Sequence, residues 1–297
     1  MLHITLFGGT GTRGDGHASP PSGRLGTKPR QLFEILALRA GQTLSKEMLA
    51  DLLWEGRPPT AYVAGLESYI SVLRRQSGLG AGRTSILATA DNGYTLDTAR
   101  CTVDLLELRA LADGVARSSF AEVVHSSERA LELCSGGLLP HEPYARWAVD
   151  AREEVGGLLS MLLTRGAQSA LALGLPERAV PLAEAAIRHD PRHEEAWQHL
   201  MRAQWFCGDT NQALRTYLRL RSMLVDEMGQ EPADETAGLY LAVLAHSTRR
   251  GADEHHHSEL RLLLTLLRQA LDGVPGLRTP ALDDDLSSAA MRLLADR

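Results

Sequence analysis

The sequence predicts a mainly α-helical protein in which a small α+β domain precedes an all-α domain. Three observations predict it. The first hundred residues follow the order strand, three helices and β-hairpin; the rest is largely helical in its apolar pattern; and two segments of it align at a spacing of 34 residues. A length of 297 residues suits two domains. We expect a first domain over 1–100, a second over 101–248, and a linker with a helical extension over 249–297.

Composition excludes several classes of protein. No apolar run reaches the roughly 18 residues of a membrane-spanning helix, and the first residues lack the basic and then apolar pattern of a secretion signal. Three cysteines, widely spaced, indicate neither a disulfide framework nor a zinc site. We find no catalytic motif and expect a cytoplasmic protein without membrane contact, catalytic residues, metal or cofactor.

Three amphipathic helices follow the first strand. Apolar residues at helical spacing predict them over 29–40, 45–55 and 60–76. In the second helix, Ser45 is a suitable N-cap, and we expect Met48, Leu49, Leu52 and Leu53 to face inward.

A hairpin completes the first domain. In the third helix Leu66, Ile70 and Leu73 mark the buried face, and Asn92-Gly93 beyond it is the strongest turn signal in the chain. Strands, three helices and a hairpin follow the order of a winged helix-turn-helix, whose third helix enters a DNA groove. Residues 1–100 hold 11 Lys and Arg against 8 Asp and Glu, whereas 101–297 hold 20 against 29. This distribution fits a nucleic-acid module joined to a protein-binding one.

The segment GGTGTRG offers a different interpretation. Gly9-x-Gly11-x-x-Gly14 has the spacing of a dinucleotide-binding fingerprint, which would make the chain a nicotinamide enzyme. That site needs a helix directly after the glycines, but two prolines and further glycines follow. Glu34 lies at the distance of the acidic residue that binds ribose, yet within a helical pattern. We therefore expect a strand and a glycine-rich turn, and no enzyme.

The second domain carries an internal repeat. LALGLPERAV and WFCGDTNQAL align Gly174 with Gly208 and Ala179 with Ala213, each 34 residues apart. This is the tetratricopeptide period, in which glycine closes the turn between paired helices and alanine lets them approach. Pro191 marks the junction between one pair and the next. We predict a tetratricopeptide-like helical-repeat domain.

These segments together resemble a known family. KPRQLFEILAL, LSKEMLADLLWEGRPP, SYISVLRR and DNGYTLD resemble the DNA-binding domain of Streptomyces antibiotic regulatory proteins, a relative of the response-regulator winged helix. HDPRHEEAWQHLMRAQWFCGDTNQALRTYLRLRSMLVDEMGQEPADET resembles the bacterial transcriptional activator domain of the same family. The resemblance implies a sheet ahead of the first helix, and an activator acting at the nucleoid that binds direct repeats of promoter DNA near the −35 element. It also implies head-to-tail self-association, contact with RNA polymerase holoenzyme through sigma and alpha or beta subunits, and control of a secondary-metabolite gene cluster.

The candidate DNA-binding residues follow from the winged-helix geometry. We expect base-edge contacts from Ser68, Tyr69 and Val72; phosphate or sugar contacts from Ser71, Arg74, Arg75 and Arg30; and contacts near the wing from Arg83 and Asn92. Family members commonly carry a basic residue where this chain has Val72, which cannot pair with guanine. The alternative is a tetratricopeptide-type interaction scaffold whose winged helix does not bind DNA. The small basic excess and Val72 favour that alternative.

Overall fold

The structure is a computed structural model, and it describes residues 1–14, 17–19, 25–76, 79, 85–90 and 92–247. Its N-terminal part contains, in chain order, β1 Leu2–Thr5, β2 Gly11–Gly14, β3 His17–Ser19, α1 Thr27–Leu38, β4 Leu44–Ser45, α2 Lys46–Leu53, α3 Tyr62–Gln76, β5 Leu87–Ala90, β6 Gly93–Leu96 and β7 Cys101–Val103. Its helical part contains α4 Asp104–Gly114, the 3₁₀ turn η3 Val115–Arg117, α5 Phe120–Leu133, the 3₁₀ turn η4 Arg146–Ala148, α6 Val149–Ala172, α7 Pro176–His189, α8 Glu194–Phe206 and α9 Thr210–Met228.

The N-terminal sheet has the order β3-β2-β1-β7. β1 pairs antiparallel with β2 and parallel with β7, so the expected sheet ahead of the first helix is confirmed. The dinucleotide interpretation is wrong. Gly8 and Gly9 form the turn between β1 and β2 with φ of +72° and +141°, while Gly11 and Gly14 bound a strand. β3 follows them, and the first described helix begins only at Thr27, so no described helix starts directly after the glycines as a dinucleotide site requires.

Three helices form the core of the N-terminal part. Leu66, Ile70 and Leu73 on α3 are buried, as the pattern predicted. The Ser45 hydroxyl accepts a hydrogen bond from the backbone N–H of Met48 at 3.1 Å, which confirms the N-cap of α2. The inward position of Met48 was wrong: its side chain is 50% exposed. It lies about 100° around the helix from Leu49, whose side chain fills the inward face.

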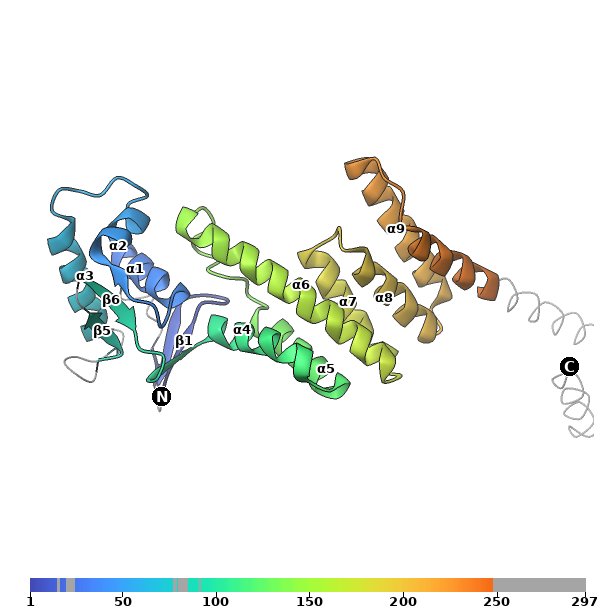
Figure 1. Cartoon of the computed structure of the whole chain (residues 1–297), viewed down its shortest axis with the longest axis horizontal. Coiled ribbons are helices and arrows are strands. Elements are labelled where there is room, and N and C mark those ends of the chain that lie inside the picture. The colour runs from blue at the N-terminus through green and yellow to red at the C-terminus, as the bar shows by residue number, and fades with distance from the viewer. Residues whose placement is uncertain (15–16, 20–24, 77–78, 80–84, 91, 248–297) are drawn as a thin grey trace, which may run out of the picture. The chain divides into compact units, whose positions relative to one another are not determined.

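The wing is a three-stranded sheet of order β4-β6-β5. β5 and β6 pair antiparallel, with Ala90 opposite Gly93, so Gly93 is the first residue of β6 rather than part of the turn. β4 pairs with β6 through Leu44 opposite Tyr94 and Ser45 opposite Gly93. A side chain at position 93 would overlap the Leu44 carbonyl, so glycine is required there. The predicted hairpin is confirmed, and with α1 to α3 it makes a winged helix-turn-helix (Figure 1).

The helical part contains the predicted repeat. Gly174 and Gly208 both have positive φ, +71° and +88°. Their N–H groups donate to residues three positions earlier, Gly174 to Leu171 at 3.0 Å and Gly208 to Trp205 at 2.9 Å. Each of the helices α5 to α9 packs against the next (Figure 1). The tetratricopeptide-like interpretation is confirmed.

The division of the chain remains a prediction. β7 lies beyond the expected division after residue 100, yet it pairs with β1, so the N-terminal sheet extends past that division. The described residues up to Tyr240 belong to one compact unit. The expected extension over 249–297 lies outside the described residues. Among the described residues, no helix is both long enough and apolar enough to cross a membrane.

Candidate DNA interface

One face of α3 is exposed and polar. Ser68, Ser71 and Arg75 follow one another at spacings of three and four residues, which places them on one side of the helix. Tyr69 and Val72 lie half-buried at the edge of this face. The ring of Tyr69 lies 6.4 Å from that of Trp54, between centroids. Of the predicted base-edge residues, Ser68 is therefore the most accessible, and Tyr69 and Val72 have packing contacts as well.

Arg74 joins α3 to the wing. Its guanidinium donates to the Leu87 carbonyl from Nε at 3.1 Å and from Nη2 at 2.8 Å. Nη2 also donates to the Thr89 hydroxyl at 2.8 Å. Arg74 thus fixes the position of β5 relative to α3, whatever else it contacts, whereas its neighbour Arg75 is exposed.

A hollow of about 610 Å³ lies between α3 and the wing. We call it the wing crease; it is lined by Lys46, Glu67, Ile70, Ser71, Arg74, Arg75, Thr89 and Tyr94. Three cations and three hydroxyl groups face it, and these are the groups that proteins use to hold DNA phosphates. The sequence pattern did not predict the positions of Lys46, Thr89 and Tyr94, which belong to α2 and the wing strands. The signal was the position of Lys46, directly after the N-cap of the helix that precedes α3.

The wing turn is tied to the start of α2. The Asn92 side-chain amide donates to both carboxylate oxygens of Glu47 at 3.1 Å, and its backbone oxygen accepts from the N–H of Lys46 at 2.9 Å. Hydrogen bonds to the carboxylate from its own backbone N–H, Asn92 and Ser45 lower the pKa of Glu47. These contacts hold the turn beside α3. Arg83 lies outside the described residues.

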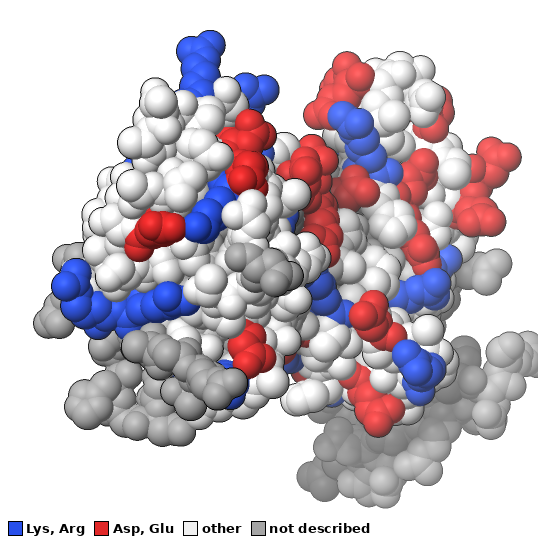
Figure 2. Space-filling model, turned by 60° about the vertical axis from the view of Figure 1, so that its left-hand side comes forward, with Lys and Arg blue, Asp and Glu red and all other residues white. Residues whose placement is uncertain are grey.

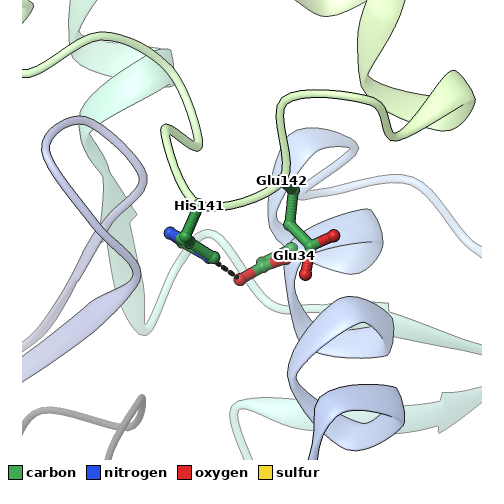
Figure 3. Close-up of side chains that lie close together, drawn as sticks. All are labelled: Glu34, His141 and Glu142. Atoms are coloured by element: carbon green, nitrogen blue, oxygen red, sulfur yellow. Dashed lines mark hydrogen bonds and ion pairs between the residues drawn. The ribbon is translucent and has the colours of Figure 1, made fainter.

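Arg30 lies at the junction between the winged helix and the helical part. Its Nη2 donates to Oε1 of Glu142 at 2.7 Å, and its Nε lies 3.5 Å from Oε1 of Glu34. Figure 3 shows Glu34 on α1 beside His141 and Glu142, which come from the loop preceding α6. The predicted phosphate contact of Arg30 is untested, but the structure gives its guanidinium carboxylate partners in the same chain.

We call this group, Arg30, Glu34, His141 and Glu142 with Thr10, the junction cluster. Glu34 is fully buried, and its Oε1 accepts from the Thr10 hydroxyl at 2.6 Å and lies 2.7 Å from Nε2 of His141. Burial raises the pKa of Glu34. Burial would also raise the pKa of Glu142, but hydrogen bonds from Arg30 and Gln31 prevail and lower it.

The ligand atoms of Glu34, His141 and Glu142 lie within 4.8 Å of one another, close enough for a metal ion. Arg30 already supplies a positive charge between the two carboxylates. We therefore assign the cluster to the junction rather than to a metal site.

The surface charge differs between the two parts. Figure 2 shows acidic side chains spread over the helical part on the right, while basic side chains border the winged-helix part on the left. The distribution agrees with the excess of acidic residues after position 100.

Comparisons with known proteins agree with this architecture. A family model described as the bacterial transcriptional activator domain matches residues 103–244. The chain is 31% identical over 254 residues to the regulatory protein DnrI of Streptomyces peucetius, covering 82% of this chain and 92% of the relative. It is 29% identical over 231 residues to the transcriptional regulatory protein MoaR1 of Mycobacterium bovis, covering 74% and 73%.

A solved structure has the same fold. Mycobacterium tuberculosis EmbR, in complex with a low affinity phosphopeptide, matches with a TM-score of 0.68 at 23% identity, covering 88% of this chain and 70% of that one. Winged helix, tetratricopeptide-like repeats and these relatives agree. The chain belongs to the Streptomyces antibiotic regulatory protein family of transcriptional activators, and it is a regulator rather than an enzyme.

Proposed function

We propose that this regulator binds promoter DNA in a sequence-specific manner, with α3 in the major groove and the wing against the backbone. The observation that carries the proposal is the exposed polar face of α3 beside the wing crease, where Lys46, Arg74 and Arg75 gather with hydroxyl groups. In protein–DNA interfaces, cations and hydroxyl groups contact the phosphates of the DNA backbone, and other polar side chains contact base edges in the groove. The arrangement of α3 and the wing crease matches this division.

The proposed contacts differ by residue. Ser68, Tyr69 and Val72 would meet base edges, while Ser71 and Arg75 would hold a phosphate. Arg74 would add positive charge to the crease from its place against β5. We also propose weaker contacts to the DNA backbone from Asn92, Arg83 and Arg30. Those of Asn92 and Arg30 are weaker because both residues have carboxylate partners in this chain.

Activation would depend on the helical part. We propose that protomers bind direct repeats head to tail near the −35 element and that residues 101–248 contact RNA polymerase holoenzyme through sigma and alpha or beta subunits. The target would be a secondary-metabolite gene cluster. Support comes from the family and from the acidic character of this part, which suits a protein rather than a DNA partner.

The test is selection of genomic fragments by the purified full chain, read by sequencing. We expect enrichment of a direct repeat upstream of or overlapping a −35 element. The same selection with Arg75→Ala should recover fewer fragments of the same repeat. Random recovery by the unmodified chain at low salt would contradict the proposal.

One observation favours the second candidate, an interaction scaffold. Arg30 and Lys46 pair with carboxylates of the same chain, so two cations of the winged helix are already neutralised. Salt separates the candidates: a DNA reader loses affinity steeply as salt rises while keeping its preferred sequence, and a scaffold shows neither behaviour.

A further inference from the structure

One carboxylate lies on the helix that the proposed function places in the DNA groove. Glu67 belongs to α3, and its side chain is 56% exposed at the rim of the wing crease. It lies one position before Ser68 and one turn before Ser71, next to the face that would meet the bases. A carboxylate there opposes every phosphate contact, so its presence requires either compensation or a specific use.

Lys46 provides the compensation. Its Nζ donates to Oε1 of Glu67 at 2.7 Å, and this hydrogen bond is the largest cause of the raised pKa of Lys46. The ammonium comes from the first residue of α2, whose backbone is fixed by the Asn92 carbonyl. The pair therefore brings no net charge to the DNA-facing surface and holds the carboxylate in one place.

The chemistry of the carboxylate determines which groups on the DNA bases it can recognise. An ionised carboxylate only accepts hydrogen bonds. In the major groove, the groups that donate are the exocyclic amino groups of cytosine and adenine, and Glu accepts from cytosine N4. Guanine O6 and N7 and thymine O4 are acceptors and would be left facing a negative charge.

We propose that Glu67 determines specificity at one base pair of the operator by accepting a hydrogen bond from an amino group of cytosine or adenine. Lys46 acts as the positioning residue. The inference rests on the proposed function, because it needs α3 to enter the major groove.

The experiment compares three full-length chains on a library in which each position of the selected operator is varied: the unmodified chain, Glu67→Ala, and Glu153→Ala. Glu153 is exposed on α6, so Glu153→Ala removes one carboxylate charge at a site outside the wing crease. At one position, the unmodified chain should prefer an amino-bearing base by about 5- to 150-fold, as for a single base contact. Glu67→Ala should lose that preference and keep the others, and Glu153→Ala should keep all of them.

A second pair of variants tests the positioning role. Lys46→Met should weaken the same preference without abolishing binding, and Lys46→Arg should restore it. A merely structural Lys46 would alter Tm and leave the base profile as it was.

The outcomes are distinguishable. If Glu67→Ala binds all sequences more tightly with an unchanged base profile, Glu67 only neutralises Lys46 and the inference is overturned. If the unmodified chain shows no base preference at any position, the proposed function fails and the inference fails with it.

Discussion

At the scale of single residues, adjacent positions of α3 have different roles. Arg74 donates three hydrogen bonds to the wing, while Arg75, one residue on, is exposed. The helix turns by about 100° per residue, so neighbours in sequence face different surroundings. The sequence could predict two cations at the end of this helix but not which of them is bound to β5, because Leu87 and Thr89 lie 13 and 15 positions after Arg74.

These two arginines give a paired prediction. Arg75→Ala should weaken binding to all DNA sequences and reduce the salt slope of the affinity by about 1, with Tm unchanged, because an exposed phosphate contact is lost. Arg74→Ala should lower the free energy of unfolding by about 1–2 kcal/mol, because charge-assisted bonds to the wing are lost. Salt-dependent fluorescence anisotropy and urea denaturation separate the two effects. Equal loss of stability in both variants would show that Arg75 is also a structural residue.

At the scale of elements, local signals predicted the turns and missed the surfaces. A glycine that ends one helix shortly before the next helix begins is a signal carried by a few neighbouring residues. Both Gly174 and Gly208 have the expected left-handed φ. The exposed position of Met48 depends on which side of a short helix meets α1 and α3, which periodicity over eight residues determines poorly.

The repeat turn can be tested at one glycine. Gly208→Ala should lower the free energy of unfolding by about 1–2 kcal/mol, because φ of +88° places a Cβ in the left-handed region. Gly157→Ala is the matched control in the body of α6, where a Cβ meets nothing within 4 Å; it should raise stability by about 0.5–1 kcal/mol. Both are measured by urea denaturation. If Gly208→Ala left the free energy of unfolding unchanged, the turn would adopt another backbone conformation at no cost.

At the scale of the whole molecule, residues far apart in the sequence join the winged-helix and helical parts. Asp104 at the start of α4 accepts hydrogen bonds from the N–H groups of Leu6 and Phe7 at 2.7 and 2.9 Å. The junction cluster brings Glu34 of α1 to His141, 107 positions later. The sequence predicted the order of both parts, but no local pattern marks such a pair, since its two residues lie in distant segments of the chain.

The junction predicts a pH dependence of stability. Burial raises the pKa of Glu34 above 4.5, so at pH values just above 4.5 the folded chain binds more protons than the unfolded one. The free energy of unfolding therefore falls as pH rises through the raised pKa. The glutamine in Glu34→Gln does not titrate, so this variant should not show that decrease. The difference in free energy of unfolding, variant minus unmodified chain, should therefore increase with pH and then level off.

Urea denaturation from pH 4.5 upward measures this difference, with Glu153→Gln as the exposed control. Asp104 is also buried with a raised pKa, but it is present in all three chains and cancels. Parallel pH profiles for the unmodified chain and Glu34→Gln would contradict the assigned role of burial.

Photocrosslinking tests whether α3 enters the DNA groove. The full chain is prepared with p-benzoylphenylalanine at position 68 on the exposed face of α3, or at position 218 on α9, where Leu218 is 53% exposed. Each is irradiated on the selected operator. We predict crosslinks to bases from position 68 and none from position 218. DNA that is bound without a crosslink from position 68 would show that α3 does not enter the groove, because another surface would then hold it.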